Sequence, residues 1–322
     1  MNCAMGQDVL LGIVTMNRID KLTRTLQECA GRGFRDIVVV DNGSTDGSRD
    51  YLLGKSGVHA LFPEKNEGGS GGFNRLMRHF IENTQHKWLL LFDDDAYPAF
   101  SQRLLSECLQ GETGGHPPAY TFKVTYPDGT ICTMNRPGMN ILNTNPLKLL
   151  HVDHHVQDCD EARMVDFASF AGILLKRETI EEIGYVSKEF FIYSDDIYYT
   201  LAISSRLGKI RYRPDFVFIH DCNRSSRRMG NQDSARMQKD IANKIVLLRE
   251  YSRYRFLYCV LYISRQILLN PKRMWGILAA ARMGVSVDLE LYRNEMPSLD
   301  VLHSQSTPAR MHKERPLVSV GG

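Results

Sequence analysis

The stretch W-L-L-L-F-D-D-D-A-Y-P, residues 88–98, joins an apolar run of strand length directly to three consecutive carboxylates. Packing does not explain this junction, because acidic side chains without a neighbouring base repel one another unless water or a cation screens them. Hard divalent cations prefer carboxylate oxygens as ligands. We therefore expect a metal site at the C-terminal end of a strand, the edge at which open α/β sheets bind their ligands.

The chain on either side of this stretch alternates between apolar strand-like runs and helical spacing through residue 110. Strands are predicted at 9–15, 36–40, 58–62 and 88–93, and helical spacing of apolar residues runs through 19–29 and 73–80. Strands that alternate with helices predict a parallel, doubly wound sheet of the α/β class.

The pattern changes after residue 111, where a Gly-Gly-His-Pro-Pro break is followed by a predicted hairpin over 121–133. Residues 134–160 have little periodicity and are predicted to be irregular. The later pattern predicts a buried strand at 167–175, a short helix at 177–183, a helix capped by residues 193–196 and a strand at 209–220. We predict three segments: a catalytic domain at 1–232, a basic helical region at 233–297 and a disordered tail at 298–322.

Composition and charge narrow the class of protein. With 322 residues and 43% hydrophobic content, the chain is long enough for a large globular domain with an appendage. Residues 1–208 carry 20 Lys and Arg against 27 Asp and Glu, whereas residues 209–322 carry 20 against 10. A basic C-terminal part predicts contact with the phosphates of a nucleotide or with an anionic lipid surface, and a solvated helical face is the alternative.

Targeting and cysteine patterns point to the cytoplasm. Seven cysteines lie scattered without a C-x-x-C pair, which fits a reducing compartment and argues against a zinc module. No signal-peptide pattern opens the chain, and its longest apolar run, 256–263, is shorter than the roughly 18 residues of a spanning helix. We therefore expect a cytoplasmic protein. Its basic amphipathic helices, over 235–282, are expected to contact the inner face of the membrane. The alternative is that they pack on the catalytic domain or on a second subunit.

Four clusters carry the chemistry. Asp41 follows a buried strand directly, where a carboxylate binds a base or ribose or caps a helix. The glycine-rich stretch 68–72 allows close approach to a ligand, although it is neither a phosphate loop of the G-x-x-x-x-G-K-[ST] type nor a dinucleotide fingerprint. Alternation along an extended chain predicts that Asp93 and Asp95 face one side and Asp94 the other. The fourth cluster is the acidic pair at 195–196.

Aromatic residues precede this acidic pair, Asp195-Asp196, and raise the expected pKa of a carboxylate there, as suits a general base. A helix cap is the structural alternative for Asp195. His220 ends a predicted strand, where an imidazole can complete a metal shell or serve only in packing. Three arginines at 224, 227 and 228 are predicted to form a lid over a diphosphate or a basic surface loop. The basic excess accompanies apolar helices rather than aromatic strands, so nucleic-acid binding is not expected.

The sequence resembles the family 2 inverting glycosyltransferases of the GT-A fold. The matching pieces occur in the family's order over roughly residues 8–225: I-V-T-M-N-R at 13–18, V-V-V-D-N-G-S-T-D-G at 38–47, N-E-G-G-S-G-G-F at 66–73, F-D-D-D at 92–95, F-F-I-Y-S-D-D-I-Y at 190–198, and His220.

The resemblance implies roles for individual residues. Metal ligands are expected at Asp93, Asp95 and His220, with Mn²⁺ or Mg²⁺ as the ion, and Asp196 takes the position of the general base. Asp195 stands where the family has Glu, and Tyr198 stands where many relatives have a second acid, so their roles are open. The residues expected to bind the nucleoside-diphosphate sugar are Thr15, Asn17, Arg18, Asp41, Asn42, Asn66, Gly68, Gly69, Gly72, Asp93 and Asp94.

The glycine loop joined to three aspartates is similar to bacterial galactofuranosyltransferases and less specifically to rhamnosyltransferases. The resemblance therefore favours UDP-galactofuranose as donor, with a dTDP-sugar as alternative, and a glycan or lipid-linked glycan as acceptor. Two further functions remain open from the residues themselves: a metal-dependent nucleotide-sugar hydrolase, and a non-catalytic sugar-nucleotide-binding protein.

Overall fold

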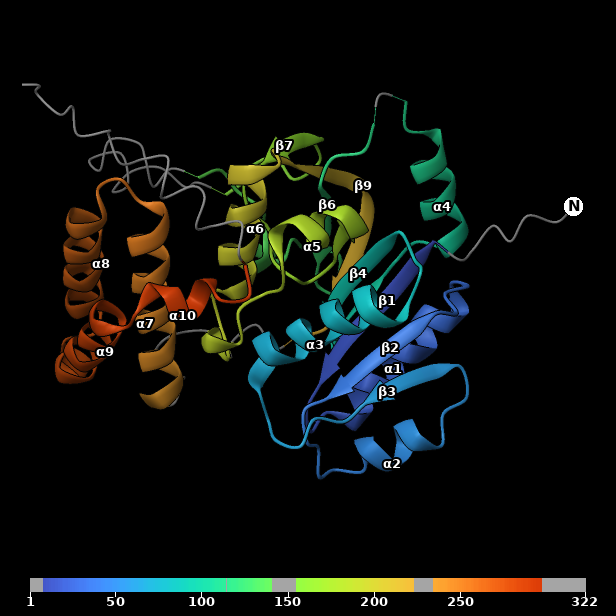
Figure 1. The fold of residues 1–322 in the computed structure, drawn as a ribbon, viewed down its shortest axis with the longest axis horizontal. Coiled ribbons are helices and arrows are strands. Elements are labelled where there is room, and N and C mark those ends of the chain that lie inside the picture. The colour runs from blue at the N-terminus through green and yellow to red at the C-terminus, as the bar shows by residue number, and fades with distance from the viewer. Residues whose placement is uncertain (1–7, 114, 141–154, 223–233, 297–322) are drawn as a thin grey trace, which may run out of the picture.

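The computed structural model describes residues 8–113, 115–140, 155–222 and 234–296. A nine-stranded sheet forms its centre, in the order β3-β2-β1-β4-β8-β6-β9-β5, with β7 paired to β9. Figure 1 shows this sheet on one side of the molecule and a group of C-terminal helices on the other. The first four strands are parallel, and β8 runs antiparallel to β4. The α/β class and the mostly parallel sheet of the N-terminal half are confirmed.

The strands of the sheet are β1 (Val9–Thr15), β2 (Ile37–Asp41), β3 (Val58–Leu61), β4 (Trp88–Asp93), β5 (Ala96–Pro98), β6 (Ala119–Thr125), β7 (Arg163–Val165), β8 (Ile173–Lys176) and β9 (Ile210–His220). The inner strands β1, β2 and β4 are apolar runs that are buried on both faces, as strands covered by helices must be. Leu11, Val39 and Leu90 are fully buried.

The helices of the first 222 residues are α1 (Ile19–Gly31), α2 (Ser48–Leu53), α3 (Gly68–Asn83), α4 (Gln102–Gly111), α5 (Arg177–Ile183) and α6 (Asp195–Arg206), with 3₁₀ turns η1 (Thr133–Asn135) and η3 (Lys188–Phe190). Two large apolar clusters fill the spaces between helices and sheet. One contains α3 residues such as Met77 and Phe80, and the other contains α1 residues such as Leu22 and Leu26.

Three local predictions need correction, and one short strand was missed. The strand predicted at 167–175 begins only at Ile173, because the chain turns at Gly172, whose φ is +93°. The hairpin predicted at 121–133 has its turn, with Tyr126 N donating to Thr130 O at 2.8 Å, but its return arm makes a single bridge at Ile131. The glycine-rich stretch 68–72 is the first part of helix α3 rather than a loop. The short strand β5 was not predicted.

The C-terminal helices are α7 (Ser234–Tyr251), α8 (Arg255–Leu269), α9 (Met274–Ser286) and α10 (Leu289–Arg293), with a 3₁₀ turn η4 (Pro271–Arg273). The continuous helical pattern predicted for 235–282 is thus divided into three helices. α7, α8 and α9 share an apolar core that includes Ile241, Ile245 and Ile277. On α10, Arg293 pairs with the buried Glu250 of α7 at 2.9 Å.

Candidate active site

The carboxyl ends of three parallel strands place their polar residues at one edge of the sheet. Thr15 of β1 is in register with Asp41 of β2, and Val14 is in register with Asp93 of β4. His220 joins them from β9 because it pairs with Ala96, directly after the three aspartates. The edge predicted to bind a ligand therefore gathers residues from four segments of the chain.

Asp41 and Asn42 form a buried polar pair at this edge. Asp41 is 1% exposed, and its Oδ1 accepts a hydrogen bond from Ser44 N at 2.9 Å. Asn42 is 2% exposed, and its Nδ2 donates to Gly68 O at 2.7 Å. Among the described residues, Asp41 Oδ2 and Asn42 Oδ1 are buried acceptors without a hydrogen-bond partner. Buried acceptors of this kind are rare in folded proteins and suit a ligand that brings hydroxyl or amide donors.

Asn17 connects the loops that follow β1 and β2. Its φ of +53° is uncommon for a residue other than glycine. Its Oδ1 accepts from Thr45 N at 2.7 Å, and its backbone N donates to Ser44 Oγ at 2.8 Å. The residue that the resemblance assigns to donor binding thus also joins the loops that follow β1 and β2.

The glycines at the start of α3 have different neighbours. Gly68 has a φ of +71°, and an added Cβ would lie 2.0 Å from Phe191 O. At Gly72, an added Cβ would lie 2.6 Å from Val14. Gly69, by contrast, has no heavy atom within 4 Å of such a Cβ. Gly68 and Gly72 are therefore required by packing, whereas Gly69 borders open space.

Asn66 fixes the entrance to α3. Its Oδ1 accepts from Gly68 N at 2.8 Å, so the first helical amide is already occupied by the chain's own side chain. Its Nδ2 lies 3.1 Å from the sulfur of Met16. Asn66 therefore stands beside both the β1 loop and the N-terminus of α3, where an anion is favoured.

The three aspartates do not alternate as the extended pattern predicts. The strand ends at Asp93, and the chain turns, so Asp94 and Asp95 both contact Arg18: its NH1 lies 3.2 Å from Asp94 Oδ1 and 2.7 Å from Asp95 Oδ2. Thr15 Oγ1 donates to Asp94 Oδ2 at 2.7 Å. Asp93 is half-buried, whereas Asp94 and Asp95 are buried.

Burial raises the pKa of Asp94 to about 7, although Arg18 and Thr15 act in the opposite direction. Asp94 is therefore a buried group that orients Arg18 and Thr15 rather than a surface ligand. The half-buried Asp93 is the aspartate that closes β4 itself.

Asp95 and His220 form a buried pair. His220 Nε2 lies 3.2 Å from Asp95 Oδ1, and both side chains are less than 10% exposed, at 6% and 7%. Burial alone would lower the pKa of His220, but the hydrogen bond with Asp95 raises it to about 10. Burial alone would raise the pKa of Asp95, but the hydrogen bond and charge of His220, together with Arg18, hold it below its usual value. A carboxylate oxygen and an imidazole nitrogen at this separation can share one cation.

Three side chains, Asn135, Cys132 and Cys222, lie close to the ring of His220, and the sequence did not indicate this cluster. His220 Nδ1 is 2.8 Å from Asn135 Oδ1, and Cys132 Sγ also donates to that oxygen at 3.0 Å. The ligand atoms of Cys132, Cys222 and His220 lie within 4.8 Å of one another. Because Nδ1 faces Asn135, Nε2 is the ring nitrogen that faces the aspartates. Asn135 falls in the segment predicted to be irregular, and no periodicity marks it.

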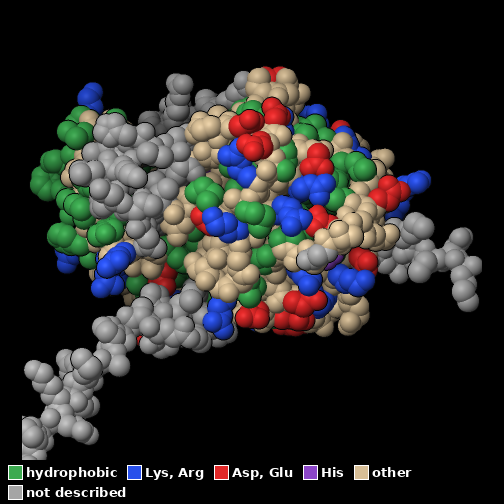
Figure 2. Space-filling model, turned by 90° about the horizontal axis from the view of Figure 1, so that it is seen from above, with side chains coloured by type: hydrophobic (Ala, Val, Ile, Leu, Met, Phe, Trp, Pro, Cys, Tyr) green, Lys and Arg blue, Asp and Glu red, His purple; other side chains and the backbone are tan. Residues whose placement is uncertain are grey.

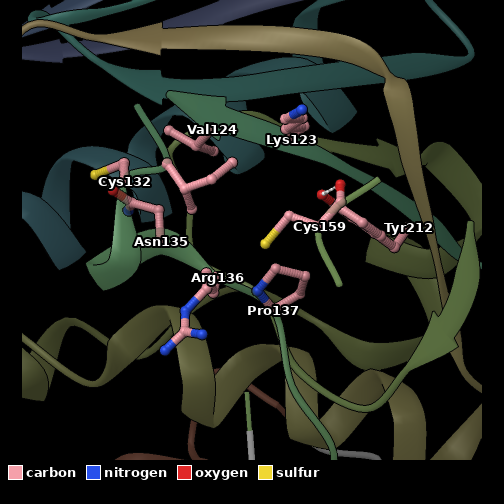
Figure 3. Close-up of a pocket in the computed structure, with 9 residues that line it drawn as sticks. Lys123, Val124, Cys132, Asn135, Arg136, Pro137, Cys159 and Tyr212 are labelled. Carbon is pink, nitrogen blue, oxygen red and sulfur yellow. Dashed lines mark hydrogen bonds between the residues drawn. The ribbon is translucent and has the colours of Figure 1, made fainter. Parts of the chain in front are cut away.

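Cys132 and Asn135 also line a small pocket (Figure 3). Tyr212 borders it, and its hydroxyl donates to Cys159 O at 2.7 Å. The pocket has a volume of about 10 Å³, which is room for about one water molecule. It is too small for a nucleotide sugar.

Asp195 and Asp196 begin helix α6 after a strained turn. Phe191, Tyr193 and Ser194 have φ values of +58°, +68° and +67°, three of the four positive values among the described residues other than glycine. Such strain persists only where the surrounding structure enforces it, and it concentrates at functional sites. The turn packs against the glycines of α3, since Ser70 N donates to Phe191 O at 3.3 Å.

The two aspartates differ in environment. Asp195 is 7% exposed, and burial, followed by the charge of Asp196 and then that of Asp93, raises its pKa to about 7. The raised pKa predicted for this pair thus falls on Asp195. Asp196 is half-buried, and its Oδ1 accepts from Ile197 N at 2.8 Å. Asp196 is therefore the more accessible carboxylate of the pair.

A residue of the C-terminal helices supports this turn. Asn243 of α7 is fully buried, and its Nδ2 lies 3.0, 2.7 and 3.0 Å from the carbonyl oxygens of Phe190, Ile192 and Tyr193. Sequence reasoning assigned no role to Asn243, and a single Asn within an apolar helical pattern was the only available signal. The three arginines predicted as a lid, at 224, 227 and 228, lie outside the described residues.

Asp221 joins β9 to the first helix, another contact that the sequence did not reveal. Its Oδ2 lies 2.7 Å from Lys21 Nζ and 2.8 Å from Arg24 NH1, both of α1. Asp221 N in turn donates to Asp95 O at 2.7 Å. These contacts hold the end of β9, and with it His220, against the aspartate turn.

Comparison with known proteins agrees with this geometry. The profile of glycosyl transferase family 2 matches residues 11–113, the part that holds β1 to β4. No curated protein sequence matches the chain.

Several solved structures share the fold at low sequence identity. The structure of GalNAc-T7 with UDP, GalNAc and Mn²⁺ has a TM-score of 0.57 to this chain at 13% sequence identity. The match covers 94% of this chain and 58% of GalNAc-T7, so this chain spans little more than half the length of GalNAc-T7. A mannosyltransferase from Pyrobaculum calidifontis, in complex with GDP-Man and Mn²⁺, has a TM-score of 0.51 at 16% sequence identity, and the match covers 92% of this chain and 79% of the mannosyltransferase. Residues 1–349 of S. aureus TarS have a TM-score of 0.50 at 14% sequence identity, and the match covers 94% of this chain and 93% of the TarS chain.

The galactofuranosyl and rhamnosyl specificities stay predictions, since none of these comparisons tests them. The family match and the shared fold together give one conclusion. Residues 11–113 are similar to glycosyl transferase family 2, and the chain shares the α/β fold of the solved structures named above.

Proposed function

We propose that the protein is an inverting glycosyltransferase that moves a sugar from a nucleoside diphosphate to an acceptor hydroxyl. One observation supports this more than any other: a single sheet edge brings together Asp41, the aspartates 93–95 and His220, and the charge of Asp93 acts on Asp195 of the pair 195–196. These groups suit the three tasks of the reaction: holding a nucleoside, neutralising a diphosphate and accepting a proton.

The nucleoside would bind beside Asp41 and Asn42. Their partnerless buried oxygens can accept hydrogen bonds from a ribose or a base. Thr15 ends β1 beside Asp41, and Asn17 and Arg18 follow it in the chain. The donor sugar and diphosphate would lie toward Asn66 and the open space at Gly69, near the N-terminus of α3, which favours negative charge.

The residues also suit a divalent cation, Mn²⁺ or Mg²⁺. Asp93, Asp95 and His220 would hold it, because Asp95 and His220 already lie within 3.2 Å of each other and Asp93 ends the neighbouring strand. A bound cation would neutralise charge on the departing nucleoside diphosphate. Arg18, which contacts Asp94 and Asp95 here, would be free to contribute a further positive charge to the diphosphate.

Asp196 would act as the base. It takes the proton of the acceptor hydroxyl as that oxygen forms a bond to the anomeric carbon, and the bond from this carbon to the diphosphate oxygen breaks with both electrons leaving on the nucleoside diphosphate. A single displacement inverts the anomeric centre. Burial raises the pKa of Asp195, so Asp195 would hold its proton more readily than Asp196. Asp196 would then be the charged member of the pair.

The donor that the resemblance favours is UDP-galactofuranose, and a dTDP-sugar such as dTDP-rhamnose is the alternative. The acceptor would be a growing surface glycan or a lipid-linked glycan. The structures with UDP or GDP-Man and Mn²⁺ share the fold and make both uridine and guanosine donors reasonable members of a test panel.

A donor panel with Mn²⁺ tests the proposal. We expect one nucleotide sugar to raise the melting temperature, since a ligand at 100 times its Kd stabilises by about 2.7 kcal/mol. The variant Asp41→Asn should weaken this effect, whereas Asp50→Asn, on the exposed side of α2, should not. Release of nucleoside diphosphate that requires an acceptor supports transfer. Equal release without any acceptor supports a hydrolase, and no shift with any uridine, thymidine or guanosine sugar contradicts donor binding.

A further inference from the structure

The C-terminal helices expose a concentration of large hydrophobic side chains. Of the 17 exposed large hydrophobic residues among those described, 11 lie between Tyr254 and Leu291. We call the following eight the C-terminal apolar face: Phe256, Leu257, Val260, Leu268, Leu269, Trp275, Leu278 and Met283. Phe256 is 81% exposed, Leu268 80% and Trp275 77%. Figure 2 shows hydrophobic side chains gathered at this end of the molecule.

These side chains are not needed for the internal packing of the helices. The core between α7, α8 and α9 is already filled by other residues, among them Ile241, Tyr258 and Ile277. α9 has a second apolar side opposite that core, and Arg282 is its only charged residue. A helix that is apolar on all sides is normally covered, because exposing such side chains to water is unfavourable by roughly 25 cal/mol per Å².

The charge of the same segment indicates what covers it. Residues 252–286 contain six basic residues and no Asp or Glu: Arg253, Arg255, Arg265, Lys272, Arg273 and Arg282. A second copy of the chain placed on this face would oppose like charges. An anionic lipid surface would oppose unlike ones, at about 1 kcal/mol for each Lys or Arg near it.

We infer that α8 and α9 dock on the surface of an anionic lipid bilayer, with the C-terminal apolar face inserted among the acyl chains and the basic residues at the headgroups. Apolar and basic residues in one helical segment are typical of interfacial membrane binding. Trp275 suits this placement because tryptophan prefers the membrane interface. Among the described residues, no helix is long and apolar enough to cross a membrane, so the helices would lie on it.

The inference does not depend on the proposed enzymatic activity, although it would suit a lipid-linked acceptor. Helix α7 connects the C-terminal apolar face with the proposed active site. It packs on α8 and α9, and its Asn243 holds the turn before Asp195. Docking would therefore keep the catalytic edge at a defined distance from the bilayer.

Vesicle binding tests this inference without any sugar nucleotide. The full-length protein is mixed with vesicles of phosphatidylcholine alone, or of phosphatidylcholine with phosphatidylglycerol, and separated by flotation. We expect it to float with the anionic vesicles, and high salt to release much of it by screening. Trp275 supplies a second measurement, because the other tryptophan, Trp88, is buried, so a blue shift of emission reports Trp275.

Two double variants separate the contributions. Phe256→Glu with Trp275→Glu should abolish binding, and Arg265→Glu with Lys272→Glu should reduce it at least tenfold. The matched control is Leu53→Glu with Arg103→Glu, which changes a 65% exposed Leu on α2 and an exposed Arg on α4. Unchanged circular dichroism and melting temperature verify that each variant folds.

Three results would overturn the inference. The first is a failure of the unmodified protein to bind anionic vesicles. The second is equal binding by the control and both test variants. The third is a dimer in sedimentation velocity that Phe256→Glu with Trp275→Glu dissociates, without vesicle binding, which would assign the face to a second copy.

Discussion

Asn243 Nδ2 lies 2.7 Å from the carbonyl oxygen of Ile192, so a buried amide of the C-terminal helix α7 holds the strained turn that precedes Asp195 and Asp196. The same nitrogen reaches the carbonyls of Phe190 and Tyr193 at 3.0 Å. Backbone with positive φ persists only under such external support. The C-terminal helices therefore take part in positioning the proposed base.

Asn243→Asp should lower turnover far more than donor binding. The change keeps the shape of the side chain but replaces donors with a carboxylate that faces three carbonyl oxygens, which costs about 1–3 kcal/mol of stability. Turnover and donor affinity are measured separately, by product formation and by calorimetry. Asn270→Asp, at the end of α8, is the control. Loss of donor affinity equal to the loss of turnover would contradict a role confined to the turn.

Asp196→Asn should retain donor binding while transfer falls by about 10²–10⁴-fold, the usual contribution of a general base. Asp195→Asn should reduce transfer less, because Asp195 is buried and reaches the acceptor less directly. Steady-state kinetics with both variants measure this difference. Near-normal turnover in Asp196→Asn would sink the assignment, and the opposite order of the two variants would move the base to Asp195.

The stability of the protein should fall as pH rises from about 4 to about 7, in part because of Asp195. Its pKa is raised from 3.8 to about 7 by burial and by the charge of Asp196. Between these two values the folded state holds the proton and the unfolded state does not, so stability decreases as pH increases. Thermal melts at pH 5 and pH 7.5 should show a smaller decrease for Asp195→Asn than for the unmodified protein. An identical decrease would show that Asp195 does not contribute.

Asn135→Ala should weaken Mn²⁺ binding, because Asn135 holds the ring of His220 through Nδ1 at 2.8 Å. Loss of such a supporting contact typically reduces metal affinity by about 10–100-fold. Electron paramagnetic resonance of unbound Mn²⁺ measures affinity without any turnover. His220→Ala gives the upper limit of the effect, and Asn83→Ala, at the far end of α3, is the control. Unchanged Mn²⁺ affinity in both His220→Ala and Asn135→Ala would remove the metal site from this edge.

Two neighbouring glycines should respond differently to the same substitution. Gly68→Ala should lower the free energy of unfolding by about 1–3 kcal/mol, since φ is +71° and the new Cβ would lie 2.0 Å from Phe191 O. Gly69→Ala should leave stability unchanged, because nothing lies within 4 Å, but should weaken donor binding if the sugar occupies that space. Urea unfolding and donor titration test both. Equal destabilisation by the two variants would contradict this reading of the turn.

Sequence patterns alone predicted much of the N-terminal half. Apolar runs that stop at Asp41 and Asp93 predicted the strands β2 and β4, because a strand buried on both faces must be apolar until it leaves the sheet. The same runs placed each carboxylate at the C-terminal end of its strand. The order of motifs also indicated the family, which the match over residues 11–113 supports.

Sequence patterns failed where long-range contacts decide the structure. The strand expected at 167–175 is shortened by a turn at Gly172, and the alternation of the three aspartates ends as β4 turns toward β9. Residues far along the chain decide those conformations: Phe218 lies against Gly172, and Arg18 and His220 contact Asp95. A local window of sequence does not contain these contacts.

The first four buried strands, the carboxylates that end β2 and β4, and the basic and apolar character of the C-terminal helices were determined by the sequence itself, because period, turn residues and charge are local properties. Only the tertiary structure decided which aspartate is buried, that His220 is oriented by Asn135, and that Asn243 supports the turn before the acidic pair. These are properties of burial and of hydrogen bonds across more than 50 residues of chain, and they arise only when separate segments pack together.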